Sequence, residues 1–281
     1  MSAGPDALLP AEMALAAEEV GVKKAALPAL SLVLLGVLAG AFIGLGALFG
    51  TVAGTDPAGL LPWGLGRVLT GFAFATGLVL VIVGGAELFT GNALLAMAWA
   101  SGRVSTRAVV RNWVLVFLAN ALGAVATAFL VFAARSWTLA DGAVGRSLLD
   151  SARTKCALEP LQAIAAGILA NALVCLAVWL TFSARSTVDR VIAVILPVAA
   201  FVASGFEHSI ANLFTVPLAL LVKASGSLPI DVVRYEGLTV QAFLLNNLLP
   251  VTLGNLIGGT VLVGSVYWLV YLRIRPPATG A

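Results

Sequence analysis

The chain has 281 residues, of which 60% are hydrophobic and only 10% are charged, and its mean hydropathy is +1.05. A soluble domain carries about 25% charged residues, so the composition excludes an ordinary soluble protein and indicates an integral membrane protein. The formal net charge of +3 is small, and the basic residues lie in loops and flanks. They are therefore topology signals, and a nucleic-acid-binding surface is excluded.

The start of the chain is typical of a helical lead-in. Residues 1–22 are rich in Ala and Glu and lack the basic stretch, apolar stretch and cleavage site of a signal peptide. We expect a cytoplasmic N-terminal segment at residues 1–24, a membrane domain at 25–275 and a cytoplasmic tail at 276–281.

Six apolar segments are expected to cross the membrane, and a straight spanning helix needs about 20 residues. In chain order they cover residues 25–50, 67–100, 112–134, 161–182, 191–222 and 240–272. The second, fifth and sixth are too long for one such helix. We expect the second and the fifth to be two half-helices each, broken at mid-membrane by irregular backbone, which is tolerated only where it is buried or lines a cavity.

The two segments expected to break share the motif Gly-x-Glu-x-x-x-small-Asn. It covers residues 85–92 and 205–212, and its glutamates, Glu87 and Glu207, lie 120 positions apart (207 − 87). These are the only carboxylates within the expected spans, and the second motif also holds the only histidine, His208. Ionisable groups in hydrocarbon are expensive and point to function. The pattern therefore indicates a transport pathway.

The motif belongs to a longer internal duplication. Residues 36–40 resemble residues 167–171, an offset of 131 (167 − 36), and Asn120 matches Asn255, an offset of 135 (255 − 120). The matches keep their order in two repeats, residues 25–134 and 161–272. Each repeat has three spans, so the second must enter the membrane upside down. This predicts an all-α integral membrane fold of six helices, a 3+3 inverted repeat with a midplane site.

Loop charges set the expected orientation. The short loops at residues 101–111 and 183–190 are basic, and basic loops lie preferentially inside. Both termini are therefore expected in the cytoplasm, with the long connection at 135–160 outside.

Several long stretches resemble the formate/nitrite transporter family. They are Gly-Ala-Glu-Leu-Phe-Thr-Gly-Asn at 85–92, Asn112-Trp113, and residues 167–175, 200–212 and 250–259. The resemblance covers residues 23–275. It implies an aquaporin-like six-span subunit, a homopentamer with one substrate path per subunit, and the bacterial inner membrane.

The resemblance also implies roles for single residues. His208 is similar to the family's central histidine, and Thr90 to the threonine in the loop that breaks the second helix. The implied substrate pathway also contains Asn171, Asn255, Glu207 and Lys155. The implied constriction and gate residues are Phe74, Leu78, Leu88, Phe89 and Phe201.

The chemistry of these positions fits a small monovalent anion. Half-helix N-termini present unsatisfied N–H groups and a positive dipole end at a break. An anion that crosses a dry apolar ring must shed water, so the uncharged acid crosses more easily. The unperturbed pKa of histidine is about 6.5, which allows His208 to lend the proton. The alternative is a neutral ring, hydrogen-bonded to Thr90 or Asn171, that only fixes the loop.

The two glutamates invite a proton-relay or metal interpretation. For Glu87 we favour a structural role in which the carboxylate caps backbone N–H groups of the broken helix. Glu207 is more open, because Lys155 can pair with it or can draw anions into an outer funnel.

The leading hypothesis is a passive or proton-coupled channel for formate, with nitrite or hydrosulfide as alternatives in the same class. A neutral-solute channel is less favoured, since twin Asn-Pro-Ala signatures are absent. An enzyme or a membrane redox carrier is also less favoured, because one histidine and the scattered Cys156 and Cys175 supply no metal or cofactor site. We expect no cofactor, and the expected partners are the anion, protons, lipid and other copies of the chain.

Overall fold

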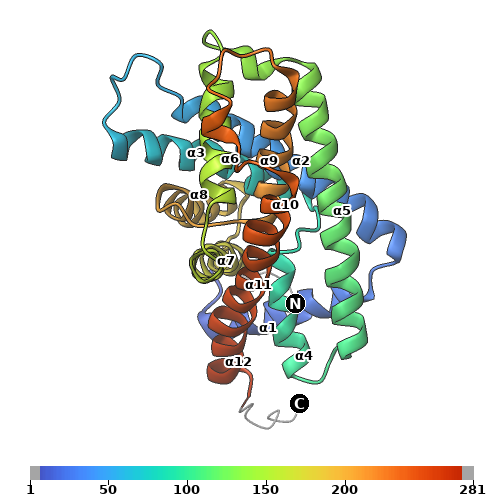
Figure 1. Cartoon of the computed structure of the whole chain (residues 1–281). Helices are drawn as coiled ribbons and strands as arrows, with labels where there is room; N and C mark the ends of the chain where they lie inside the picture. The colour runs from blue at the N-terminus through green and yellow to red at the C-terminus, as the bar shows by residue number, and fades with distance from the viewer. Residues whose placement is uncertain (1–6, 274–281) are drawn as a thin grey trace, which may run out of the picture.

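The computed structural model describes residues 7–273, and every regular element in that range is a helix (Figure 1). The first half of the chain forms α1 (Pro10–Ala26), α2 (Ala29–Gly54), α3 (Trp63–Gly84), η1 (Gly91–Leu94), α4 (Leu95–Ala100) and α5 (Thr106–Ala133). After η2 (Ser136–Thr138), the second half forms α6 (Ala143–Cys156), α7 (Pro160–Ser183), α8 (Thr187–Ala203), α9 (Ser209–Ser225), η3 (Val233–Tyr235) and α10 (Val240–Ala242). The expected tail at 276–281 lies outside the described residues.

Five helical stretches among the described residues are long and apolar enough to cross a membrane. They are Ala29–Gly54, Trp63–Gly84, Thr106–Ala133, Pro160–Ser183 and Val233–Tyr271, while Ser209–Ser225 is apolar but shorter. An all-helical chain with several apolar spans is what the sequence predicts.

The sixth apolar segment, although too long for a straight span, is not interrupted. α10 continues through η4 (Phe243–Leu248), α11 (Leu249–Ile257), η5 (Gly258–Ser265) and α12 (Val266–Tyr271) without a gap. Both η4 and η5 are π-helical, a conformation that occurs mostly as short insertions within α-helices. The extra length is therefore taken up inside one helical rod.

Neither glutamate motif is covered by a continuous helix. α3 ends at Gly84 and helical structure resumes at Gly91, while α8 ends at Ala203 and α9 begins at Ser209. A glycine in the left-handed region follows the first helix of each pair: Gly85 comes directly after α3 and Gly205 comes after Ser204 at the end of α8, both with φ +76°. Glycine adopts this conformation without a steric penalty and is the usual residue at such a helix end.

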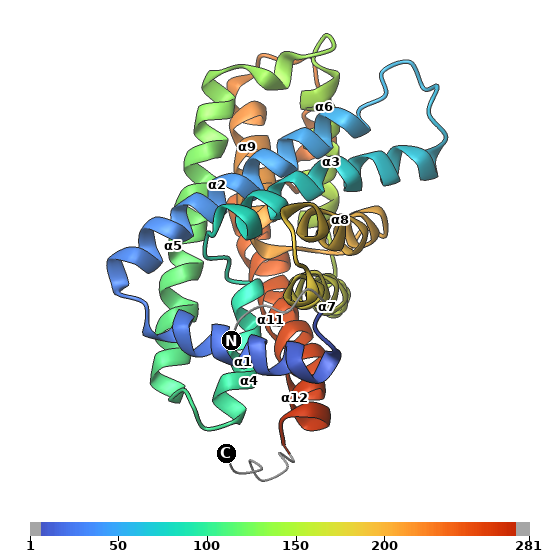
Figure 2. The ribbon, with the colours of Figure 1, turned by 180° about the vertical axis from the view of Figure 1, so that it is seen from behind.

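α1 is a docked helix and lies across the end of the molecule that also carries α4 and α12 (Figures 1 and 2). Its buried Met13, Ala14 and Ala17 pack in one cluster with Met97 of α4 and Trp179 of α7. On the other side of α1, Glu18 and Glu19 pair with Arg103 at 3.0 and 2.9 Å.

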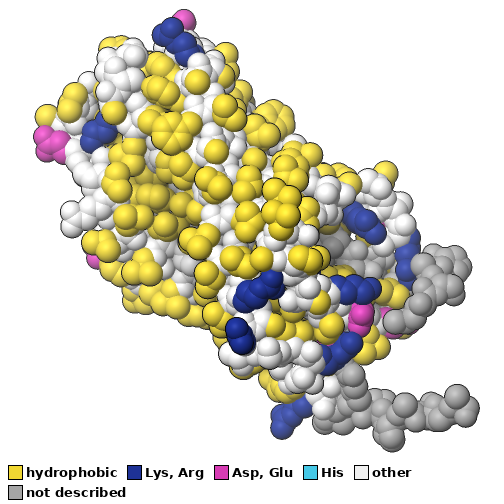
Figure 3. Space-filling view, turned by 90° about the vertical axis from the view of Figure 1, so that its right-hand side faces the viewer, with side chains coloured by type: hydrophobic (Ala, Val, Ile, Leu, Met, Phe, Trp, Pro, Cys, Tyr) yellow, Lys and Arg dark blue, Asp and Glu magenta, His cyan; other side chains and the backbone are white. Residues whose placement is uncertain are grey.

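The outer surface of the helices is apolar. On the face seen in Figure 3, hydrophobic side chains cover the middle, and Lys and Arg lie toward the ends. Leu118 and Leu122 of α5 remain 60% and 61% exposed. Exposed apolar surface on this scale indicates contact with lipid or with another protein surface.

Gly40→Ala is expected to loosen the contact between α2 and α5. A Cβ at Gly40 would overlap the carbonyl oxygen of Asn120, which is main chain and cannot turn aside. Overpacking of this kind costs about 1–3 kcal/mol, so the thermal midpoint of the detergent-solubilised protein should fall. Gly64→Ala is the matched control, since nothing lies within 4 Å of its Cβ. An equal shift in both variants would contradict the close approach.

Candidate functional site

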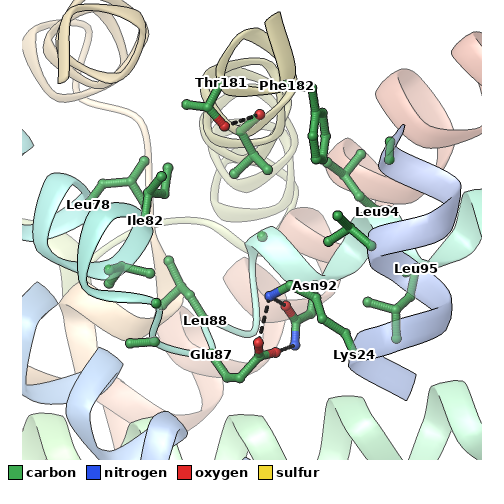
Figure 4. A pocket seen from close by; sticks show the side chains of 18 of the residues that line it. Lys24, Leu78, Ile82, Glu87, Leu88, Asn92, Leu94, Leu95, Thr181 and Phe182 are labelled. Atoms are coloured by element: carbon green, nitrogen blue, oxygen red, sulfur yellow. Dashed lines mark hydrogen bonds and ion pairs between the residues drawn. The ribbon is translucent and has the colours of Figure 1, made fainter. Parts of the chain in front are cut away.

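Two pockets enter the molecule from opposite ends. The first, named here the Lys24 pocket, is lined by residues of α1, the end of α3, residues 85–92, α7 and Arg190 near the start of α8. Its lining includes Lys24, Leu78 and Leu88 (Figure 4). The second, the Lys155 pocket, is lined by residues of α2, α3, α6, the end of α8 and residues 205–212. α1 and α6 lie toward opposite ends of the molecule (Figure 1).

A buried polar cluster stands at the Lys24 pocket. Lys24 Nζ donates to Glu87 Oε1 at 2.8 Å and to Asn92 Oδ1 at 2.9 Å. Asn92 Nδ2 donates to Glu87 Oε2 at 2.7 Å and to Asn112 Oδ1 at 2.9 Å, and Asn112 Nδ2 donates to the Lys24 carbonyl at 3.2 Å. Figure 4 shows the lysine, the glutamate and Asn92 converging from α1 and the motif.

The same cluster is built again at the Lys155 pocket. Lys155 Nζ donates to Glu207 Oε1 at 2.8 Å, and Asn212 Nδ2 donates to Glu207 Oε2 at 2.7 Å. Asn212 Nδ2 also donates to Asn247 Oδ1 at 2.7 Å, and Asn247 Nδ2 donates to the Lys155 carbonyl at 3.2 Å. Each carboxylate thus has a cationic partner and an amide partner, as a buried charge requires.

Two further asparagines hold the irregular backbone of the motifs. Asn120 Oδ1 accepts from Phe89 N–H at 2.9 Å, and its Nδ2 donates to the carbonyls of Gly36 and Glu87 at 2.7 and 2.9 Å. Asn255 Oδ1 accepts from Ser209 N–H at 2.9 Å, and its Nδ2 donates to the carbonyls of Gly167 and Glu207 at 2.8 and 2.9 Å. Both side chains are fully buried.

These contacts correct the expected role of Glu87. Its carboxylate does not cap backbone N–H groups; it binds the side chains of Lys24 and Asn92. The backbone N–H of Phe89 is satisfied by Asn120 instead. The amide of Asn120 can hold this backbone where a carboxylate cannot, because an amide both accepts from one main-chain N–H and donates to two main-chain carbonyls.

His208, which lines the Lys155 pocket, meets Thr90, which is not among the lining residues of either pocket. Thr90 Oγ1 lies 3.0 Å from His208 Nε2, and both residues are buried. His208 Nδ1 accepts the N–H of Ala211 at 3.2 Å and so caps the start of α9. A ring nitrogen that accepts carries no hydrogen, so in the neutral ring Nε2 is protonated and donates to Thr90.

Asn171 lies on the other side of the threonine. Its Nδ2 donates to the carbonyls of Thr90 and Asn255 at 3.2 and 2.6 Å. Asn171 therefore ties the first motif to α11. The sequence offered Thr90 and Asn171 as partners of the His208 ring, and the ring contacts Thr90.

The expected constriction residues divide between three places. Phe74 and Phe201 meet edge to face with ring centroids 5.6 Å apart, and Phe201 stacks at 6.0 Å on His208; these three line the Lys155 pocket. Leu78 and Leu88 line the Lys24 pocket. Phe89 instead contacts Phe117 at 5.0 Å and lines an apolar groove outside both pockets.

Sequence reasoning missed Lys24 as a site residue and placed it at the end of the N-terminal segment. A signal was available, since Lys155 follows Lys24 by 131 positions (155 − 24), the offset found for Gly36 and Gly167. The place of Asn112 and Asn247 in the two clusters was not foreseen either.

Comparison with known proteins identifies relatives over nearly the whole chain. The family model described as "Formate/nitrite transporter" matches residues 11–269. "Formate channel FocA" of Escherichia coli (strain K12) is 42% identical over 277 residues, covering 95% of this chain and 96% of that protein. Of the solved structures, "Pentameric formate channel with formate bound" aligns with a TM-score of 0.81 at 43% identity, covering 87% of this chain and 98% of that one. "FNT family ion channel" aligns with a TM-score of 0.80 at 28% identity, covering 92% and 98%.

Asn255→Leu is expected to destabilise the second motif. It removes three hydrogen bonds and leaves the buried N–H of Ser209 without its acceptor, and one such buried group alone costs about 1–3 kcal/mol. Asn246→Leu is the control, because this exposed neighbour makes one bond, to the Cys156 carbonyl. The thermal midpoint should fall clearly more for Asn255→Leu, and equal midpoints would refute the clamp.

Proposed function

The chain belongs to the formate/nitrite transporter family, and on that premise we propose that it forms a membrane channel for small monovalent anions, with formate as the substrate. The single observation in this molecule that carries the proposal is the buried Thr90–His208 contact at one of two pockets that open from opposite ends. Nitrite and hydrosulfide remain the alternatives within the class, with less support from the relatives' names.

We propose an architecture of six spans, in which α2, α3 with α4, and α5 form the first repeat and α7, α8 with α9, and α10 to α12 form the second. The two repeats are related by inversion, and the second and fifth spans are broken at mid-membrane. Support comes from the paired clusters, since Lys24, Glu87, Asn92 and Asn112 repeat the bonds of Lys155, Glu207, Asn212 and Asn247. Residues 25–134 and 161–272 thus form one channel domain, preceded by segment 1–24 and followed by the tail at 276–281.

We propose that the protein lies in a bacterial inner membrane with both termini in the cytoplasm. The Lys24 pocket then faces the cytoplasm and the Lys155 pocket faces outside. This follows from the basic short loops and agrees with the position of α1 and α12 at one end of the molecule (Figure 1). A homopentamer is proposed from the pentameric relative and from the apolar exterior of helices such as α5.

In the proposed path an anion enters one pocket, crosses the apolar layer and leaves through the other. Phe74 and Phe201 on one side, with Leu78 and Leu88 on the other, exclude water, so desolvation is the main barrier. At the layer, His208 Nε2–H and the hydroxyl of Thr90 are donors that can replace part of the lost hydration.

Proton coupling, in this proposal, acts through His208 Nε2. To give up that proton the ring must first gain a second one at Nδ1, which breaks the bond from Ala211 N–H. A neutral hydrogen bond contributes about 0.5–1.5 kcal/mol, and an anion beside the ring offsets this by attraction. Anion entry and ring protonation would then favour one another.

Formate selectivity is tested by flux into proteoliposomes that contain the purified protein. We expect formate to enter faster than the larger acetate under equal gradients, because the proposed path is narrow and dry. We expect it also to enter faster than nitrite or hydrosulfide, since formate is the anion in the names of the relatives. Empty liposomes supply the background. Equal rates for all four anions would remove the assignment of formate.

His208→Asn is expected to abolish the pH dependence of formate flux while the oligomer stays folded. Asparagine is a favoured N-cap and can accept the N–H of Ala211 in place of Nδ1, so α9 keeps its start. Flux is measured from pH 5 to 8, with Thr90→Ser as a control that keeps the hydroxyl. An unchanged pH profile in His208→Asn would exclude proton transfer through this ring.

A further inference from the structure

The charges of the Lys155 pocket are unequally matched. Lys155 pairs with Glu207 at 2.8 Å. Asp150 pairs with Arg234 at 2.7 Å and accepts the hydroxyl of Tyr235 at 2.9 Å. The remaining charged residue in the lining is Arg67, and among the described residues it has no carboxylate partner.

Arg67 is held in place by main chain. It stands near the start of α3, and its Nε donates to the carbonyl of Ala203 at 3.1 Å while its Nη2 donates to the carbonyl of Val202. These carbonyls belong to the last turn of α8, where the helical ladder ends, and the Val202 carbonyl also accepts the N–H of Gly205 at 3.1 Å. Asp56 lines a neighbouring pocket together with Arg67 but forms no ion pair with it among the described residues. The guanidinium is thus held at the Lys155 pocket by main chain.

A helix end offsets only part of this charge. The C-terminus of a helix is equivalent to about −0.5 of an elementary charge, against the full positive charge of an arginine. The ion pairs of the same pocket each sum to zero. The charged residues that line the Lys155 pocket therefore leave an excess of positive charge, and it originates at Arg67.

We propose that Arg67 is the residue that gives the Lys155 pocket its attraction for anions, acting as an electrostatic steering group while Lys155 is held by Glu207 in the polar cluster. This inference rests on the proposed function only for the identity of the anion. A fixed, partly buried positive charge at the mouth of a narrow pocket raises the local anion concentration and the entry rate, and added salt weakens it.

The opposite pocket is arranged in a parallel way. Lys24 is paired with Glu87, and Arg190 near the start of α8 lines the same pocket without a carboxylate partner among the described residues. α3 and α8 pack against each other, so each helix contributes an arginine from its first two turns to the pocket where the other helix ends. The field at each mouth would then favour anions from either direction.

The potential in the pocket is measured directly with a thiol probe. Ser151 is exposed and lines the Lys155 pocket together with Arg67. In the full-length Ser151→Cys protein, the rates of modification by a negatively charged sulfonate and a positively charged trimethylammonium methanethiosulfonate are compared. Native Cys156 and Cys175 are buried, and burial raises the pKa of Cys156 to about 11, so the unsubstituted protein gives a low blank.

In this background Arg67→Gln keeps a hydrogen-bond donor and removes the charge. The rate ratio, negative over positive reagent, should fall roughly three- to tenfold at low salt. Arg67→Lys should restore most of the ratio. Arg146→Gln is the matched control, since Arg146 also donates to a main-chain carbonyl near the same end but does not line the pocket; its ratio should not change.

Arg67→His provides a switch within one protein, useful where the glutamine variant does not fold. Its ratio should rise as the pH falls from 8 to 5.5, because histidine gains charge around pH 6.5, and the ratio in wild-type background should stay level. The proposal is overturned if Arg67→Gln leaves the rate ratio unchanged, or if the ratio in Arg67→His does not vary with pH. It is also overturned if Arg67→Lys lowers the ratio as much as Arg67→Gln does.

Formate flux separates this inference from the proposed function. Initial uptake in proteoliposomes is compared at about 10 mM and 300 mM ionic strength, between which the Debye length falls several-fold. Wild type should lose rate with salt, and Arg67→Gln should be slower at low salt with a flatter dependence. If wild type carries no formate, the proposed function fails, and the labelling ratio still decides the role of Arg67.

Discussion

The clamp that Asn120 and Asn255 place on the main chain is the constraint on which both pockets depend. At each motif the helix stops, and a short stretch of backbone must be satisfied without helical partners inside an apolar protein. One asparagine meets this need with three bonds, to an N–H just after the glutamate and to two carbonyls. Because each clamp also reaches a neighbouring helix, through Gly36 or Gly167, it fixes the loop relative to the helix walls. The lysine, glutamate and amide clusters then fill the space beside the clamps with fully paired charge, which makes them supports for the loop.

The two motifs are alike at the residues that hold the backbone and differ at the residues placed along the proposed path. At an offset of 120, Leu88 stands in place of His208, and Ile210 stands in place of Thr90. The imidazole and the hydroxyl therefore come from opposite motifs and from unequal positions, yet their contact closes at 3.0 Å. A duplicated scaffold allows this, since the clamps keep both loops in place whatever side chains stand at the intervening positions. Of the apolar residues at the equivalent positions, Leu88 lines the Lys24 pocket and Ile210 is fully buried.

Much of this arrangement could be predicted from residue order alone. Hydropathy located the apolar segments, the glycines at 85 and 205 marked where helices end, and the repeated glutamates drew attention to the site. Lys24 was assigned to the N-terminal segment, because a lysine at the end of a polar helix is usually a topology signal. Only its match with Lys155 in the second half indicates a role at the motif. Phe89 was expected beside Leu88 at a gate, but adjacent residues in irregular backbone face different ways, and it packs on Phe117 instead. The pairing of Lys155 with Glu207 was one of the two alternatives foreseen for that lysine. The partners of Glu87 could not be foreseen, since they depend on how α1 and α5 approach the first motif in space.

The imidazole of His208 links the chemistry of the proposed path to the helix that follows it, α9. One ring nitrogen meets Thr90 at the dry layer, and the other holds the first turn of α9 through Ala211. If the ring only supported the loop, any good N-cap residue could replace it. If the ring only moved protons, a second nitrogen without a hydrogen-bond partner would be easier to protonate. Here the second nitrogen is occupied, so a change of protonation at the layer must alter the start of α9, and a shift of α9 must alter the affinity of the ring for a proton. Linkage of this kind is reciprocal. The short helix α9 begins directly after His208 and carries Asn212 of the Lys155 cluster. The charge on the imidazole and the geometry of that cluster therefore influence each other through α9.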